Sequence, residues 1–222
     1  MPTLHVVNVF TALDGSEGNP LGVFLEGSAI PEADRQAVAT DLNYSETVFV
    51  DDAASGRLQI YTPTHQLPFA GHPLVGTSWL MRREEAAVAT LRPPAGEVPT
   101  WVEGEQTWIR GRAEWSPDFV FVQLDSADEV AALTAAPGDA TDGYYWAWED
   151  ESIGRVRSRN FIPSLGVPED PATGSAAVSL AARLDRALLI TQGNGCVLEA
   201  RLGPDGTSEV GGRTVLSEVR PY

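Results

Sequence analysis

Two short turns, each opening a helix without charged residues, constrain this chain more than any other feature. The first turn reads Pro-Phe-Ala-Gly-His-Pro over residues 68–73, and the second reads Glu-Asp-Pro-Ala-Thr-Gly-Ser-Ala over residues 169–176. The segments after them carry no charge before Arg82 and Arg183. A helix that is apolar on all sides must be buried, yet its N-terminus presents unpaired N–H groups and partial positive charge. The sequence therefore predicts two buried helices whose N-terminal ends form one anion-binding, acid–base site.

The two turns also resemble each other, which indicates an internal duplication. Gly71-His72 aligns with Gly174-Ser175 in a weak repeat about half a chain length apart. The repeat predicts two similar domains with the site in the crevice between them. The alternative is that both segments are core helices that merely begin at glycine. The polar residues at the helix openings favour the first interpretation.

Composition excludes several classes of function. The chain has 222 residues, enough for one large or two small domains, and 43% of them are hydrophobic. A net charge of −16 disfavours binding to nucleic acid or to an anionic membrane surface. All fifteen basic residues are Arg, so no lysine can form a Schiff base, hold pyridoxal phosphate or serve a phosphate-binding loop.

Cysteine and histidine usage points away from metal and thiol chemistry. The single cysteine, Cys196, cannot form an internal disulfide, a two-thiol mechanism or a cysteine-rich zinc site. The three histidines lack metal-ligand spacing. The N-terminus resembles no signal peptide, and no segment has the length of a transmembrane helix. We therefore expect a cytoplasmic protein with neither metal nor cofactor.

The hydrophobic pattern predicts an α+β chain that is mostly strand, with one buried helix in each half. We expect a domain boundary in the Gly- and Pro-bearing stretch 111–117, which gives an N-terminal half 1–112 and a C-terminal half 113–222. Helices are predicted at 31–42, 73–83 and 174–184. Strands are predicted at 4–10, 22–26, 47–50, 57–62, 88–92, 98–102, 107–110, 119–124, 144–148, 156–162, 196–202 and 210–216.

Three residues are candidates for proton transfer. His72, at the opening of a buried helix, has a side chain suited to acid–base work near neutral pH, although a lone histidine more often packs or caps. Asp170 precedes Pro171 in an extended stretch and could transfer protons, or simply cap the helix. Glu46 directly precedes an apolar strand. If it points inward its pKa should rise, but periodicity alone leaves a solvent-facing position open.

The residues around the helix openings are candidates for binding substrate. Thr173 and Ser175 could hold a substrate oxygen, or cap the second helix. Gly71 and Gly174 would let backbone N–H groups approach a carboxylate closely. His5 and His65 show no supporting pattern, and we interpret both as structural or surface residues.

Together these residues suit removal and return of a proton beside a carboxylate. Phosphoryl transfer is disfavoured because no phosphate loop or metal-binding carboxylate cluster occurs. Acyl transfer by a Ser-His-Asp triad is disfavoured because no Gly-x-Ser-x-Gly motif occurs.

The same motifs resemble the PhzF-type phenazine biosynthesis family of the diaminopimelate-epimerase-like superfamily. The resemblance extends from about residue 6 to about residue 212. It rests on Gly-Asn-Pro-Leu-Gly-Val at 18–23, Asn-Tyr-Ser-Glu-Thr at 43–47, Tyr-Thr-Pro at 61–63, and the two turns at 67–73 and 169–176. It implies two pseudo-symmetric domains, each a curved, mostly antiparallel sheet around a central helix, and a homodimer. It also implies cofactor-independent isomerisation of trans-2,3-dihydro-3-hydroxyanthranilate.

The resemblance also implies roles for individual residues. Glu46 corresponds to the proton-shuttling glutamate, and His72, Asp170 and Ser175 to residues around the substrate. Gly71 and Gly174 correspond to the backbone N–H groups that hold its carboxylate. Related racemases carry a cysteine at each helix opening, and this chain carries none there, which disfavours a two-thiol racemisation.

The chain departs from the family pattern at two places that bear on the site. Gln66 stands where relatives commonly have glutamate, which removes one carboxylate near the site. The chain is also shorter than typical members, with the missing residues between about 84 and 155.

We therefore expect an isomerase of a small unsaturated or cyclic carboxylic acid. The alternatives are a catalytically silent protein that binds a small acid, and an epimerase or lyase acting on an amino or hydroxy acid.

Overall fold

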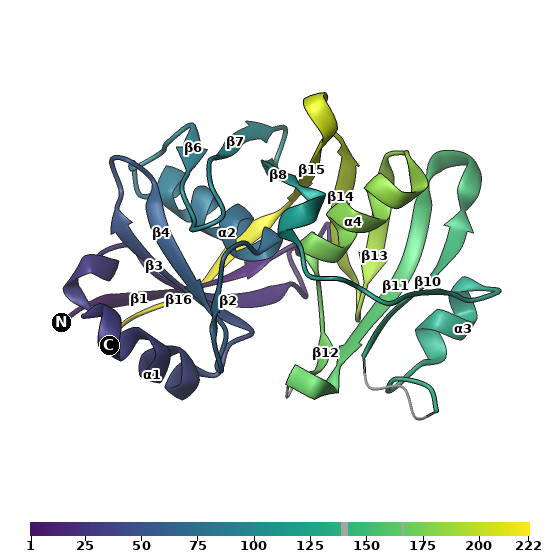
Figure 1. Cartoon of the computed structure of the whole chain (residues 1–222), viewed down its shortest axis with the longest axis horizontal. Helices are drawn as coiled ribbons and strands as arrows, with labels where there is room; N and C mark the ends of the chain where they lie inside the picture. Colours follow the sequence, from purple (N-terminus) through teal and green to yellow (C-terminus); the bar gives the residue numbers. More distant parts are fainter. Residues whose placement is uncertain (139–141, 166) are drawn as a thin grey trace.

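The computed structural model describes residues 1–138, 142–165 and 167–222. The chain forms two lobes that lie side by side, one built mainly from the first half of the sequence and one from the second (Figure 1). Each lobe contains one long buried helix, α2 (Gly71–Arg83) in the first and α4 (Gly174–Leu184) in the second. The α+β fold with two similar halves, predicted from the sequence, is confirmed.

A six-stranded sheet forms the base of the first lobe. Its order is β16-β1-β2-β3-β4-β5, and only β2 and β3 run parallel. The strands are β1 (Thr3–Val9), β2 (Asn19–Phe24), β3 (Glu46–Asp52), β4 (Arg57–Tyr61), β5 (Gln66–Leu67) and β16 (Thr214–Pro221). Helix α1 (Glu32–Leu42) connects β2 to β3. Because β16 pairs with β1, the end of the chain returns to the lobe in which it began.

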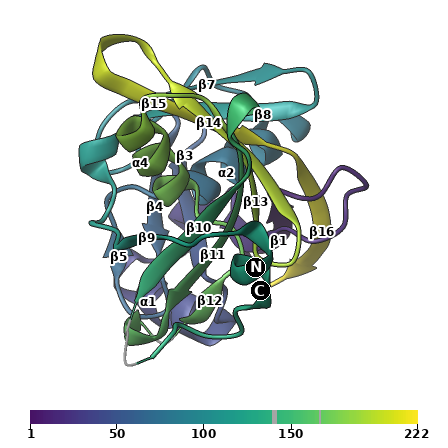
Figure 2. The same ribbon diagram turned by 90° about the vertical axis from the view of Figure 1, so that its right-hand side faces the viewer.

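A second, ten-stranded sheet runs through both lobes. Its order is β6-β7-β8-β15-β14-β13-β11-β10-β9, and β12 pairs with β11. The strands are β6 (Thr90–Leu91), β7 (Val98–Glu103), β8 (Gln106–Arg112), β9 (Phe121–Gln123), β10 (Gly143–Asp150), β11 (Arg155–Ile162), β12 (Val167–Asp170), β13 (Leu188–Gln192), β14 (Cys196–Leu202) and β15 (Thr207–Gly212). The antiparallel ladder between β8 and β15 joins the two halves. In the turned view of Figure 2 the second lobe, with β10 and β11 side by side, faces the viewer.

The two long helices are buried for the reason that the sequence predicts. Leu74, Val75 and Leu80 of α2 have no exposed surface, and the same holds for Ala177 and Leu180 of α4. Close packing of α2 against β1 also requires a glycine at position 76. A Cβ atom at Gly76 would lie only 2.6 Å from a methyl group of Val9 on β1. Burial of these apolar faces stabilises the helices against the sheets, and it fixes where their N-terminal ends lie.

The observed elements differ from the predicted ones where local signals are weak. The expected strand at 88–92 shortens to β6, and β2 begins at Asn19 rather than at residue 22. Helix α3 (Ala127–Ala132) was not predicted, because it is one short, charged turn that starts where Ser126 accepts a hydrogen bond from Glu129 N. Arg112, at the predicted domain division, is the last residue of β8. The predicted C-terminal half also contains β16, which pairs with β1 in the sheet of the first lobe. None of the described helices is long and apolar enough to cross a membrane.

Candidate active site

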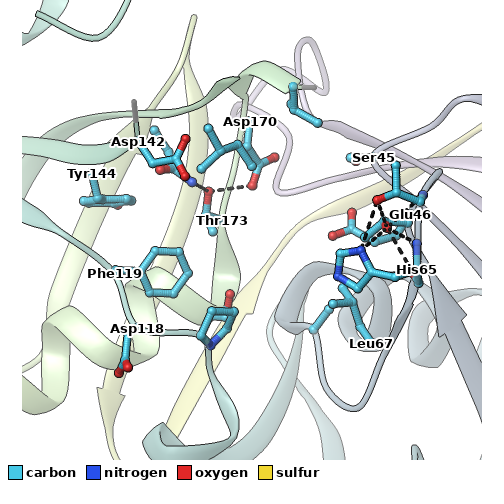
Figure 3. Close-up of a pocket in the computed structure, with 18 of the residues that line it drawn as sticks. Ser45, Glu46, His65, Leu67, Asp118, Phe119, Asp142, Tyr144, Asp170 and Thr173 are labelled. Atoms are coloured by element: carbon cyan, nitrogen blue, oxygen red, sulfur yellow. Dashed lines mark hydrogen bonds between the residues drawn. The ribbon is translucent and has the colours of Figure 1, made fainter. Parts of the chain in front are cut away.

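A cavity of about 440 Å³ opens between the two lobes and is walled by residues from both. The first half contributes the β4–β5 connection and the start of β3, and the second contributes β10, β11 and the turn after β12. Its polar lining includes Ser45, Glu46, His65, Asn160, Asp170, Thr173 and Ser175. Phe69, Phe119, Tyr144 and Ile162 supply apolar surface. Figure 3 shows Glu46 and Asp170 entering the cavity from opposite sides.

Glu46 is the first residue of β3 and points into this cavity, so its side chain is only 15% exposed. Burial and, to a smaller extent, the negative charge of Asp170 together raise the pKa of Glu46 to about 8. A hydrogen bond with Ser45 acts in the opposite direction. Because this pKa lies near neutrality, Glu46 can both accept and return a proton at physiological pH.

His72 lies behind Glu46, in the first turn of α2, and does not line the cavity. Its Nε2 atom is 3.3 Å from Oε2 of Glu46. Burial lowers the pKa of His72 to about 3, so the imidazole is neutral at physiological pH. The contact is therefore between a neutral ring and a carboxyl group rather than an ion pair.

Asp170 is the last residue of β12 and is buried, because Pro171 directs the chain from the strand into α4. Its carboxylate accepts hydrogen bonds from Asn19 Nδ2 at 2.7 Å and from Thr173 Oγ1 at 2.6 Å. Burial raises the pKa of Asp170 to about 6, although these two hydrogen bonds oppose the shift. Asp170 is thus the more acidic member of the buried carboxyl pair.

A network of buried hydrogen bonds holds Asp170 in place. Thr173 Oγ1 donates to Asp170 and accepts from Asn160 Nδ2 at 2.8 Å and from Gln192 Nε2 at 2.9 Å. Gln192 Oε1 in turn accepts from Thr173 N and from the Tyr144 hydroxyl. The Thr173 hydroxyl therefore positions the carboxylate and does not cap α4.

The N-terminal ends of α2 and α4 abut beside the cavity. A Cβ atom at Gly71 would lie 2.8 Å from the carbonyl carbon of Gly174, and one at Gly174 would lie 3.0 Å from His72 N. Among the described residues neither helix receives a side-chain cap at its N-terminus. The first-turn N–H groups of both helices therefore remain as donors for an anion.

The structure brings most of the predicted residues together. Glu46, Asp170, Thr173 and Ser175 line the cavity; His72 supports Glu46, and Gly71 and Gly174 join the helix ends next to it. Their assigned roles in binding and catalysis remain predictions.

Other residues correct the expectations from the sequence. His65 is exposed, as expected, but it also lines the cavity (Figure 3). Its side chain contacts those of Thr62 and Thr64. Gln66 is exposed and lies outside the cavity lining. The buried thiol of Cys196, whose pKa rises to about 11, likewise lies outside it.

Sequence reasoning missed three buried amides of the site, Asn19, Asn160 and Gln192. Asn19 belongs to the Gly-Asn-Pro motif, and this motif could have marked it as a site residue. The motif does not indicate which residues form hydrogen bonds with Asn19. Asn160 and Gln192 lie within ordinary strands, where the sequence offers no signal.

A buried carboxyl pair lies where the two helix-centred lobes of this α+β fold meet, and such a pair is suited to acid–base chemistry. Comparison with known proteins identifies the family. The sequence model described as phenazine biosynthesis-like protein matches residues 7–114 and 112–210, and the chain belongs to this family.

Individual relatives agree with the family assignment. A trans-2,3-dihydro-3-hydroxyanthranilate isomerase of Pseudomonas fluorescens is 32% identical over 217 residues, covering 77% of this chain and 75% of the relative. A PhzF-family crystal structure from Enterococcus faecalis has a TM-score of 0.79 at 23% identity and covers 98% of this chain and 97% of that one. A probable proline racemase from Agrobacterium radiobacter shares the fold, with a TM-score of 0.67 at 10% identity over 100% of this chain and 93% of that one. The predicted family resemblance and the predicted enzyme class, an isomerase, are confirmed.

Proposed function

We propose that this protein is a cofactor-independent isomerase of a small, unsaturated or cyclic carboxylic acid, with trans-2,3-dihydro-3-hydroxyanthranilate as the first substrate to test. The observation that carries the proposal is the pair of buried carboxyl groups, Glu46 and Asp170, facing one cavity beside two uncapped helix ends. The relative from Pseudomonas fluorescens is named trans-2,3-dihydro-3-hydroxyanthranilate isomerase and is 32% identical in sequence to this chain, which supports this choice of substrate.

In the proposed reaction Glu46 moves one proton between two carbon atoms of the substrate. Its carboxylate takes a proton from a carbon acidified by conjugation, and the electron pair of that C–H bond shifts along the unsaturated system. The same proton is then returned to another carbon, so the composition of the substrate does not change. First-turn N–H groups of α2 and α4 hold the substrate carboxylate and stabilise the charge that develops.

The cavity walls support a substrate that carries a hydrogen-bond donor next to its carboxylate. No Arg is among the described residues that line the cavity. Four acidic residues line it, namely Glu46, Asp118, Asp142 and Asp170. Asn160 also lines it, and its Oδ1 atom is buried with no hydrogen-bond partner among the described residues. An amino or hydroxyl group on the substrate would satisfy this acceptor.

The decisive experiment compares wild type with Glu46→Gln on trans-2,3-dihydro-3-hydroxyanthranilate, followed by ultraviolet absorbance and product analysis. We expect wild-type turnover, and a loss of at least ~10²–10⁴-fold in the variant, because the carboxyl acts in both proton transfers. Near wild-type turnover by Glu46→Gln would rule out the proposed mechanism.

The same experiment separates the alternatives. A silent binding protein would show a ligand-induced rise in melting temperature with no product from either protein. An epimerase would exchange solvent deuterium at a stereocentre with loss of optical rotation. The position of Cys196, buried outside the cavity, argues against a thiol-based epimerase. The cytoplasmic location and the homodimer expected from the sequence are retained as part of this proposal.

A further inference from the structure

The Asn19 side chain lies against both His72 of the first lobe and Asp170 of the second. It is fully buried at the start of β2, directly after Gly18, whose φ of 103° lets the chain turn into the strand. A Cβ at Gly18 would lie 2.9 Å from Cβ of Asn8, so this turn also requires glycine for space. The local sequence therefore fixes where the Asn19 amide lies.

The hydrogen bonds of Asn19 leave no freedom in its orientation. Nδ2 donates to Asp170 Oδ1 at 2.7 Å and to the Ala172 carbonyl at 2.9 Å, while Oδ1 accepts from Ser45 Oγ at 2.8 Å. Turning the amide over would place its oxygen against two acceptors and its NH₂ group against the hydroxyl. The donor side of Asn19 thus faces the second lobe, where Asp170 lies.

The same donor side faces His72. Nδ2 of Asn19 lies 3.4 Å from Nδ1 of the imidazole. The two hydrogens of Nδ2 point to Asp170 and Ala172, and an amide nitrogen cannot accept a hydrogen bond, so a proton on Nδ1 would face the NH₂ group with no acceptor. We therefore place the ring proton on Nε2, which lies 3.3 Å from Glu46 Oε2, although these two atoms do not form a hydrogen bond of ordinary geometry.

We propose that Asn19 is the positioning residue of the acid–base site: one amide selects the His72 tautomer that presents its N–H to Glu46, and holds Asp170 as the carboxylate. The contact joins residues 151 positions apart and crosses from one lobe to the other. The proposal deepens the function proposed above, but its first test needs no substrate.

Other ionisable groups surround the three partners and bear on any pH measurement. Glu169, adjacent to Asp170, is held by Arg159 through a bidentate pair. The further groups that line the cavity or interact electrostatically with Asp170 are Asp118, Asp142, Tyr144, His65 and Cys196. None of these side chains has a hydrogen bond to Asn19 among the described residues, so an Asn19 substitution acts first on His72 and Asp170.

The direct test reads the tautomer of His72 by two-bond ¹H–¹⁵N NMR. The chain has only three histidines, so the spectrum is assigned with a single His72→Gln control. We expect the Nε2–H pattern in wild type. In Asn19→Asp, which is nearly isosteric, an acceptor replaces the donor that faces Nδ1, and the pattern should change to Nδ1–H. Retention of the Nε2–H form in Asn19→Asp would overturn the proposal.

A titration tests the second half of the claim. Asn19→Leu removes a hydrogen bond to a charged carboxylate, so the pKa of Asp170, followed by the NMR shift of its ¹³C-labelled carboxyl carbon and assigned with Asp170→Asn, should rise by about 1 unit. The matched control is Asn160→Leu, which removes a buried amide that donates to Thr173 Oγ1 and has no side-chain hydrogen bond to Asp170 or His72 among the described residues. An equal pKa of Asp170 in Asn19→Leu and in Asn160→Leu would also overturn the proposal.

The two tests separate this inference from the proposed function. If no tested acid is turned over but the tautomer changes in Asn19→Asp, the positioning role stands and the isomerase proposal fails. If turnover depends on Glu46 but the tautomer is unaffected, the isomerase proposal stands and the role of Asn19 fails.

Discussion

The buried carboxyl of Glu46 should make the protein less stable as the pH rises, and Glu46→Gln should remove this effect. The folded-state pKa of about 8 lies above the ordinary value of 4.5. Between these values the folded protein keeps a proton that the unfolded chain releases. The stabilisation is therefore present at low pH and is lost as the pH rises through about 8.

The magnitude follows from these two pKa values. From pH 6 to pH 8 the wild type should lose about 2 kcal/mol of unfolding free energy relative to Glu46→Gln, at about 1.36 kcal/mol per pH unit below the folded-state pKa. Other groups also titrate in this window, but their contributions largely cancel because both proteins contain them. Asp170, with a pKa of about 6, completes its ionisation in the lower part of the window, and His72, which is neutral in the folded state, loses its proton there in the unfolded chain.

Urea unfolding at several pH values measures this difference. With a slope of about 3 kcal/mol per molar urea, the midpoint of the wild type should fall by about 0.7 M relative to Glu46→Gln between pH 6 and pH 8. Glu26→Gln serves as the control, because Glu26 is an exposed carboxylate outside the cavity lining, and its curve should parallel the wild type. Parallel curves for wild type and Glu46→Gln would refute the argument that the site holds Glu46 in its protonated form.

Three further predictions address the site. The value of kcat/KM should rise with pH through about 8 in wild type, since Glu46 must start as a carboxylate. In Asp170→Asn this rise should occur at lower pH, because the neutral amide no longer raises the pKa of Glu46. A rise at the same pH in both proteins would show that the two groups are not coupled. Gly71→Ala should destabilise the protein by roughly 1–3 kcal/mol in urea unfolding and reduce turnover, because its methyl group would lie 2.8 Å from the Gly174 backbone; wild-type behaviour would show that the helix ends need not abut. Cys196→Ser should keep most of the activity, and the buried thiol should resist Ellman's reagent in the folded protein, so rapid labelling or inactivity would contradict its position outside the cavity.

The sequence was most informative where physical chemistry leaves few options. A stretch without charges, such as the one after Gly174, has no stable place on a surface, and its burial in α4 follows directly. The strands predicted at 47–50 and 57–62 correspond to β3 and β4, which pair as an antiparallel hairpin. Short elements such as α3 carry too few residues for any periodicity, and the sequence alone could not place them.

The candidate site was only partly predictable, because its chemistry depends on contacts between distant segments. Whether Glu46 points inward depends on which face of β3 meets the second lobe, and the strand pattern alone did not decide this. The role of Asn19 depends on Asp170, which is 151 positions away. A motif can mark such a residue as part of a family, but its partners appear only when both lobes are assembled.

The charges of the assembled site explain why two carboxyl groups with separate pKa values are useful here. A substrate carboxylate that enters the cavity meets Glu46 and Asp170, and no Arg lines the wall in the described part of the chain. The first-turn N–H groups of α2 and α4 supply positive potential against these charges. Three negative charges within one small cavity repel one another strongly, and this repulsion increases the proton affinity of the carboxyl with the higher pKa. That carboxyl is Glu46, so the charges favour the step in which its carboxylate takes a proton from the substrate carbon, and the proton held there is the one that an isomerase returns to another carbon.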